Sequence, residues 1–278
     1  MGLITKPPSW AYCSSNVQTN AAAPMGKTVT AGANNSDGSA VSLVTLTHDV
    51  EFLVIGHANF NASGANGSTL LDILIDPAGG TSWSSLIDDL LVGQSLSMSQ
   101  SVPAPGYYFF PVWIPSGAAI GARARTARGS TINGLCYVFA FGGNENPGSW
   151  WCGQRVTSIG IDAANSQGTN HTAGSSNTYS SWTDFGSPLS AECGALQFGV
   201  HGTNTDTNQS LGAYRFEFGV ASNMIGPPIV RTTNSNEAGW RSPTGPIFKT
   251  LPSGAQLQVR GTTTGTAIPI DVAAYAVH

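Results

Sequence analysis

Charged side chains are scarce in this sequence: only 9% of the residues are Asp, Glu, Lys or Arg, whereas soluble domains usually contain about 25%. Long surface helices need such side chains on the face that meets water, so the scarcity argues against a mainly helical protein. Gly, Ser, Thr and Asn replace them, and these residues favour turns and short strands. Because 41% of the residues are hydrophobic, the chain can still form a packed core.

Basic residues are also few, with 11 Lys plus Arg and a formal net charge of −4. A nucleic-acid partner needs clustered Lys and Arg to neutralise phosphates. The nearest cluster is Arg123, Arg125 and Arg128, two of which alternate along one strand face. We therefore expect no nucleic-acid partner.

Long apolar runs and ordered cysteine spacings are missing. No run approaches the ~20 residues of a membrane span, and the first residues lack the pattern of a secretory signal, so we expect no membrane partner. The four cysteines, Cys13, Cys136, Cys152 and Cys193, form no C-x-x-C pair or zinc spacing. This favours free thiols made in a reducing cytoplasm, although later cross-links involving Cys13 and Cys152 stay open.

What the chain does contain is an internal repeat. Ile114-Pro115-Ser116-Gly117-Ala118 recurs 137 residues later as Leu251-Pro252-Ser253-Gly254-Ala255, and Arg123 recurs as Arg260 at the same spacing. Three further matches follow the same order along the chain: Thr30-Ala31-Gly32 with Thr172-Ala173-Gly174, Val54-x-x-His57 with Phe198-x-x-His201, and Leu71-x-Ile73-x-Ile75 with Phe216-x-Phe218-x-Val220. Ordered matches of this kind indicate two tandem copies of one unit.

Within each copy the apolar residues alternate with a period of two. Phe216, Phe218 and Val220 alternate with Glu217 and Gly219, as a half-buried strand requires. Short runs of this kind predict an all-β fold of two tandem antiparallel β-sandwiches. The repeat-motif residues have structural roles in this prediction, as turns or as outward-facing arginines: Pro115, Gly117, Arg123, Pro252, Gly254 and Arg260. The one stretch with helical spacing is Ser84 to Val92.

These patterns divide the chain into an N-terminal arm (1–28), a first sandwich (29–145), a linker (146–170) and a second sandwich (171–278). The arm and the linker lie outside the repeats and combine aromatic residues with sequence that cannot pack alone. We therefore expect assembly contacts there. The candidate interface residues are Trp10, Tyr12, Trp150 and Trp151.

The sequence contains none of the motifs H-E-x-x-H, G-x-S-x-G and the P-loop, which would indicate a metal, catalytic or cofactor site. His57 and His201 occupy matching places in the repeat, where a structural role is favoured over a pocket ligand. Asp72, Asp76, Asp88 and Asp89 suggest a carboxylate or calcium site, yet the second copy shows no matching acids. We expect neither a cofactor nor a metal, and no enzymatic activity.

A family resemblance is carried by Thr69-Leu70-Leu71-Asp72-Ile73, by Leu90-Leu91-Val92-Gly93, and by the run from Tyr107 to Gly117 that is followed by Arg123. These motifs resemble virion structural proteins of tailed bacteriophages with tandem jelly-roll-type units. The likeness is strong in the first copy, whereas the second keeps only Leu251 to Gly254 and Arg260. It implies jelly-roll-like sandwiches and a place in the virion.

The resemblance implies a non-enzymatic structural component of a phage virion, made in the host cytoplasm. It would be a capsid decoration protein, or a neck, collar or tail-associated protein. Its partners would be other virion proteins and copies of itself, bound as a homo-oligomer. The alternative is an adhesin that binds a host receptor or a surface glycan. A glycan depolymerase would need a carboxylate pair that the sequence does not display.

Overall fold

The computed structural model describes residues 26–58, 60, 69–92, 106–142, 151–202, 212–233, 245–265 and 269–278. These residues are almost entirely strands and turns, so the predicted all-β fold class is confirmed. A single turn of 3-10 helix, η1 (Ala163–Asn165), interrupts the described strands. Within the described ranges, no helix has the length and apolar character needed to span a membrane.

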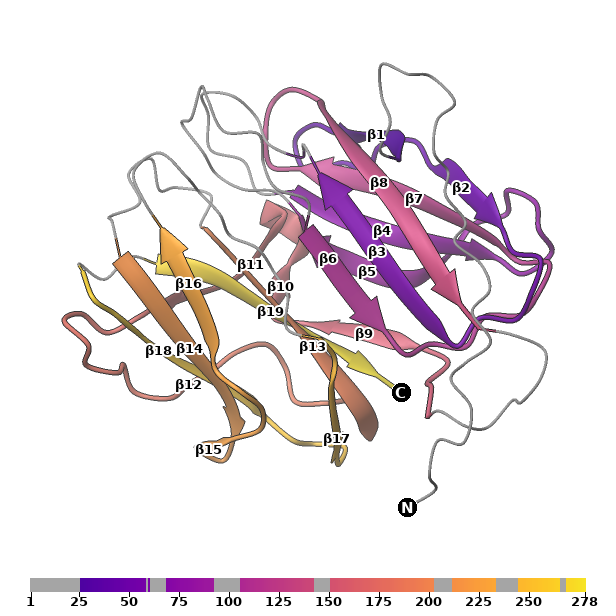
Figure 1. Ribbon diagram of the computed structural model, residues 1–278. Helices are drawn as coiled ribbons and strands as arrows, with labels where there is room; N and C mark the ends of the chain where they lie inside the picture. The colour runs from indigo at the N-terminus through magenta and orange to yellow at the C-terminus, as the bar shows by residue number, and fades with distance from the viewer. Residues whose placement is uncertain are drawn as a thin grey trace.

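The first half forms two layers of strands around one core (Figure 1). Its strands are β1 (Lys27–Gly32), β2 (Val41–Thr45), β3 (Phe52–Ala58), β4 (Thr69–Asp76), β5 (Ser84–Leu91), β6 (Gly106–Phe110), β7 (Ala119–Thr126) and β8 (Ile132–Phe141). One layer has the order β2-β7-β4-β5 and the other has the order β1-β8-β3-β6. A short parallel pairing of Ala31 and Gly32 with β7 joins the layers along one side.

The second half repeats this arrangement with three added short strands. Its strands are β9 (Val156–Ile159), β10 (Ile161–Asp162), β11 (Gln167–Thr172), β12 (Thr183–Asp184), β13 (Cys193–Gly202), β14 (Gly212–Val220), β15 (Asn223–Met224), β16 (Ile229–Thr233), β17 (Ile247–Leu251), β18 (Leu257–Thr263) and β19 (Pro269–Val277). The layers are β12-β18-β14-β16 and β11-β19-β13-β17. A parallel bridge between Gly174 and Thr262 joins them.

Both halves therefore have one strand order, in which β1 to β8 correspond to β11, β12, β13, β14, β16, β17, β18 and β19. Two four-stranded layers connected in this order form a jelly roll, and the prediction of jelly-roll-like sandwiches is confirmed. Even single hydrogen bonds recur. The Gly38 N–H donates to the Ala124 carbonyl at 2.8 Å, and the Ser180 N–H donates to the Gly261 carbonyl at 2.9 Å.

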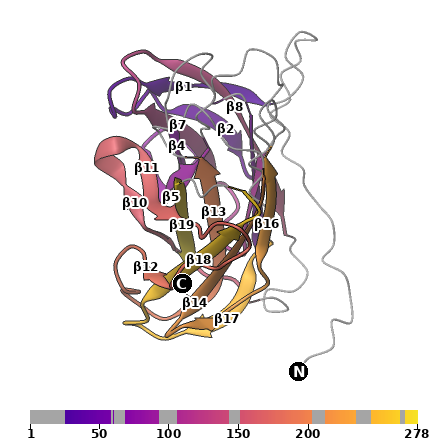
Figure 2. The same cartoon turned by 90° about the vertical axis from the view of Figure 1, so that its left-hand side faces the viewer.

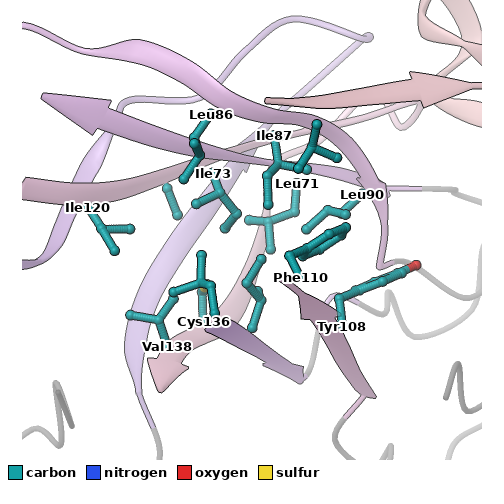
Figure 3. Packing of buried hydrophobic residues seen from close by; sticks show 14 of the residues in the cluster. Leu71, Ile73, Leu86, Ile87, Leu90, Tyr108, Phe110, Ile120, Cys136 and Val138 are labelled. Carbon is teal, nitrogen blue, oxygen red and sulfur yellow. The ribbon is translucent and has the colours of Figure 1, made fainter. Parts of the chain in front are cut away.

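Alternation along the strands fills each core. On β7, Ile120 and Ala122 are fully buried, whereas the next residue, Arg123, faces outward. Figure 3 shows Ile73 of β4, Ile87 of β5, Phe110 of β6 and Val138 of β8 meeting in the first core. Burying such a side chain contributes about 1.5–3 kcal/mol each.

The stretch with helical spacing, Ser84 to Val92, is not a helix, because Ser84 to Leu91 form β5. The helical spacing arises from two irregularities in the pairing of β5 with β4. Asp88 and Asp89 together stand opposite Asp72 alone, and Asp89 has a φ of 62°. Such bulges interrupt the alternation, so Leu86, Ile87, Leu90 and Leu91 are all buried.

Two expected boundaries were also wrong. β1 begins at Lys27, so the first sandwich starts inside the expected arm 1–28; residues 1–25 lie outside the described residues. The expected linker, 146–170, contains strands in its described part. β9 pairs with β19 over Val156 to Ile159, and β10 pairs with the start of β11. These residues belong to the second half because they complete its sheet.

The halves share a buried junction. The outer face of the β11-β19-β13-β17 layer packs against the first half where β5 and β6 border the opening between its two layers. Tyr275 of β19 enters this opening, with its ring centroid 5.4 Å from that of Tyr108 and 6.1 Å from that of Phe110. The Leu91 N–H donates to the Tyr275 hydroxyl at 2.8 Å, and that hydroxyl donates to the Asp89 carbonyl at 3.1 Å.

We predict that the two jelly rolls unfold in one cooperative transition and that Tyr275→Ala separates it into two. Loss of a buried aromatic ring costs about 3–5 kcal/mol, and loss of the hydroxyl alone in Tyr275→Phe costs about 1–3 kcal/mol because the Leu91 N–H loses its acceptor. Chemical denaturation followed by circular dichroism and tryptophan fluorescence is the measurement. Two transitions in the unsubstituted protein would contradict the shared junction.

Candidate interaction surface

The repeated Pro-Ser-Gly segments form the same turn in both halves. Gly117 and Gly254 have φ angles of 87° and 83°, a region that L residues rarely adopt. The Gly117 N–H donates to the Leu46 carbonyl at 2.9 Å, and the Gly254 N–H donates to the Leu189 carbonyl at 2.8 Å. Pro115 and Pro252 begin these turns. The structure thus places these motif residues where they support the fold.

A carboxylate and an arginine pair across the same two strands in each half. Asp72 of β4 is opposite Arg123 of β7, and Glu217 of β14 is opposite Arg260 of β18. The arginine Nε lies 2.8 Å from a carboxylate oxygen in both pairs. The expectation that the second copy has no acid matching Asp72 was therefore wrong. The apolar match of β4 with β14 already aligns Asp72 with Glu217, so the sequence carried this signal.

The residue that completes each pair differs. Asp37 brings a second carboxylate to Arg123 at 3.1 Å. Tyr179, the corresponding residue in the second half, donates a hydrogen bond to Glu217 at 2.7 Å, and its ring centroid lies 4.6 Å from the Arg260 guanidinium carbon. Burial alone would raise the pKa of the Glu217 carboxyl, but hydrogen bonds from Tyr179 and Arg260 outweigh burial and lower it.

The acids considered as a carboxylate or calcium site have structural partners. Asp76 accepts hydrogen bonds from the N–H groups of Ala78 and Ser82 at 2.9 and 2.8 Å. Asp89 forms an ion pair with Arg125, yet burial is the largest effect on its pKa and raises it to about 6. Asp88 accepts a hydrogen bond from the Ser85 hydroxyl. Among the described residues, no three His, Cys, Asp or Glu side chains are grouped as metal ligands.

The two histidines expected to match, His57 and His201, do not occupy corresponding positions, because they differ by one residue in strand register. His57 alternates with Leu53 and Ile55, which enter the first core, and it stacks on Tyr108 with a ring centroid distance of 5.8 Å. In the second half, Phe198 and Val200 enter the core, so Val200 rather than His201 corresponds to His57. A shift of one residue in a strand exchanges its two faces.

A cleft of about 660 Å³ lies beside the junction, between β5, β9, β10 and the residues 186–190. Polar groups on its walls include Asp88, Arg155, Ser158 and Asp162. The Ser158 hydroxyl donates to the Asp88 carbonyl, which connects the two halves at its edge. The cleft is thus formed by the junction itself.

An aromatic surface covers the β8-β3-β6 part of the outer face of the β1-β8-β3-β6 layer, opposite the core. It is defined by Phe52, Tyr107, Phe109, Tyr137 and Phe139, and we call it the aromatic outer face. Their ring centroids are linked at 6.5 Å (Phe52 to Phe109), 6.4 Å (Phe109 to Tyr107), 6.0 Å (Tyr107 to Tyr137) and 5.4 Å (Tyr137 to Phe139). The strands β3, β6 and β8 are therefore apolar on both faces, whereas β1 exposes threonines on its outer side.

A glycine makes room for this cluster. A Cβ on Gly56 would lie 2.1 Å from the Tyr137 ring, so a larger residue at this point of β3 would displace the ring. Tyr137 is 7% exposed, and the other four rings are partly buried. Sequence reasoning missed this surface because the alternating residues on β3, β6 and β8 are apolar on both sides, which a period-two pattern does not separate.

The interface residues expected from the sequence are placed only in part. Trp10, Tyr12 and Trp150 lie outside the described residues. Trp151 is 46% exposed, and its ring lies against Gly194 of β13. Nearby, the Trp113 N–H donates to the Gly153 carbonyl at 2.8 Å, and Trp113 is 40% exposed. Of the cysteines, Cys136, Cys152 and Cys193 are free thiols, and Cys13 is not among the described residues.

Comparisons with known proteins give structural likenesses at very low sequence identity. No family model matches the chain, and no curated protein matches it. PNGF-II is 7% identical with a TM-score of 0.33, and the match covers 86% of this chain but only 59% of that one. The CBM22-1-CBM22-2 tandem domain of Paenibacillus barcinonensis Xyn10C is 11% identical over 86% of this chain and 82% of that one, with a TM-score of 0.23.

The STIV MCP, a viral major capsid protein, is 11% identical with a TM-score of 0.27. That match covers 90% of this chain and 93% of the capsid protein. The likenesses thus include a capsid protein and a carbohydrate-binding tandem, and at these TM-scores they carry no argument about function.

We predict that His57 makes the protein lose stability as the pH falls from 6.5 toward 4. Burial removes water from the protonated ring and lowers its pKa to about 4. The unfolded chain therefore binds a proton first, and stability present above pH 6.5 falls by roughly 3 kcal/mol across this window. His57→Gln should remove this loss. Urea unfolding of both proteins between pH 7 and pH 4 is the measurement.

The unsubstituted protein, measured in the same series, is the reference. Asp89 and Asp271, whose pKa values burial raises to about 6 and about 7, act with the opposite sign. They are present in every variant, so the difference between variants isolates His57. An unchanged slope in His57→Gln would contradict the buried neutral ring.

Proposed function

We propose that the protein is a non-enzymatic structural component of a tailed-phage virion that acts by binding neighbouring proteins. The observation that carries this proposal is the aromatic outer face, a second apolar surface on a sheet whose other side already faces the core. Contiguous apolar patches of this kind mark protein interaction sites.

The composition of the surface favours a protein partner. Interface centres are enriched in aromatic residues and poor in charged ones, and the five rings form one contact network across β3, β6 and β8. The buried junction around Tyr275 joins the two jelly rolls, and restricting their relative motion would reduce the entropy lost on assembly. Jelly rolls are common in viral capsid proteins, and the sequence motifs resemble phage virion proteins.

The position we propose is on the capsid surface or in the neck, collar or tail. Trp113 and Trp151 would add contacts at the border between the halves, since both are large and exposed. Residues 1–25, with Trp10 and Tyr12, would add a further contact, and several weak contacts per copy strengthen each other by avidity.

We predict that Phe109→Asp lowers incorporation into particles without unfolding the protein. A buried interface aromatic typically contributes about 2 kcal/mol or more, roughly thirtyfold in affinity, and a carboxylate there adds a desolvation cost. Quantitative mass spectrometry of purified virions is the measurement. Met224→Asp, at a residue of β15 that is 47% exposed, is the control. Normal incorporation of Phe109→Asp would contradict the proposal. Normal particles that adsorb poorly to host cells would also contradict it, because they would favour an adhesin.

A second prediction concerns residues 1–25. Deleting them should leave the thermal unfolding of the jelly rolls unchanged, because β1 begins at Lys27, and should reduce the abundance of the protein in purified particles. Differential scanning calorimetry and the same mass spectrometry test both statements. A large fall in the melting temperature would show that this segment stabilises the first jelly roll.

A further inference from the structure

The junction between the halves joins two different surfaces. The second half contributes the outer face of its β11-β19-β13-β17 layer, with Ala195, Ala273 and Tyr275. The first half contributes the border formed by β5 and β6. Leu91 at the end of β5 is 1% exposed, and its Cδ1 atom lies 3.1 and 3.5 Å from where Cβ atoms on Gly168 and Gly199 would stand. The contact is therefore heterologous.

Because the halves share one fold, each of these surfaces has a counterpart elsewhere in the chain. Ile55 pairs with Val138 in the first half as Phe198 pairs with Ala274 in the second, and all four side chains enter a core. In this register the counterpart of Tyr275 is Phe139. The counterparts of Ala273 and Ala195 are Tyr137 and Phe52. The outer face that the second half buries at the junction thus corresponds to the aromatic outer face of the first half.

The border of β5 and β6 corresponds to that of β16 and β17. Leu70 pairs with Leu91 as Arg215 pairs with Val230, so Val230 is the counterpart of Leu91. Leu91 is covered by the other half, whereas Val230 is 62% exposed. Phe248 on β17 is 55% exposed. Within the described residues, these are the two most exposed large apolar side chains, and both lie on the border that has no second half against it.

We propose that copies of this chain associate head to tail, with the aromatic outer face of one copy packed on the β16–β17 border of the next. This inference rests on the proposed binding role and names the partner as a second copy. The contact repeats, between chains, the arrangement that joins the two halves within a chain. In Figure 2, β16 lies on the opposite side of the second half from β10 and β11.

A second copy fits because the chain carries both members of the contact, one at each half, and an apolar residue is present on each. A heterologous contact does not close on itself after two copies. It continues until a ring closes or a filament forms, which suits a collar, a tail or a lattice on a capsid.

The test uses two variants of the full chain, Phe139→Asp in the aromatic outer face and Val230→Asp on the β16–β17 border. Sedimentation velocity over a concentration series should show multimers for the unsubstituted protein. Each variant alone should associate about thirtyfold or more weakly, as expected for a central interface residue. An equimolar mixture should recover a dimer and nothing larger, because one intact outer face then meets one intact border. Met224→Asp is the control and should assemble normally.

Three results would overturn the inference: a monomer at every concentration, a loss of association by Phe139→Asp but not by Val230→Asp, or a mixture that stays monomeric. The second result would indicate a symmetric contact between two aromatic outer faces. Circular dichroism shows whether each variant folds. If Phe139→Asp does not fold, Val230→Asp still tests the inference, because Val230 is exposed. A monomeric protein that is still abundant in purified virions would overturn this inference alone and leave the proposed function standing.

Discussion

The structure depends on one insertion: the Tyr275 side chain enters the opening between β5 and β6, where it meets Tyr108 and Phe110. Its hydroxyl accepts a hydrogen bond from Leu91 and donates one to Asp89. Without this contact, the open border of the first jelly roll would expose Leu91 and the second would expose the outer face of β19. The hydroxyl is buried with partners on both sides, so the contact satisfies this hydroxyl and the Leu91 N–H as the junction takes them out of water.

Burial and pairing then explain the charged residues that remain. In a chain with so few charges, the described ion pairs gather on the outer faces of the β2-β7-β4-β5 and β12-β18-β14-β16 layers. Asp72 with Arg123 and Glu217 with Arg260 occupy one place in the fold. Duplication preserved this pair while Asp37 and Tyr179, which complete it, became different. The charges therefore pair across the strands of these two layers.

The sequence predicted the duplication, the strands and the turns at Pro115 and Pro252, because these depend on local patterns with fixed spacing. It failed where the structure depends on how strands pair with each other. The bulge at Asp88 and Asp89 made β5 resemble a helix, and a one-residue shift made His201 seem to match His57. β9 was mistaken for a linker, because a segment rich in Gly, Asn and Ser gives no local sign of its pairing with β19.

The central claim is that one kind of contact joins jelly rolls both within a chain and between chains. A three-dimensional reconstruction of the assembled particle by electron cryomicroscopy tests it most directly. The account predicts that the aromatic outer face of one copy lies on the β16–β17 border of the next. The rotation and translation between copies should then match those that relate the two halves of one chain. Copies that touch through other surfaces, with Phe139 and Val230 both facing solvent, would contradict the account.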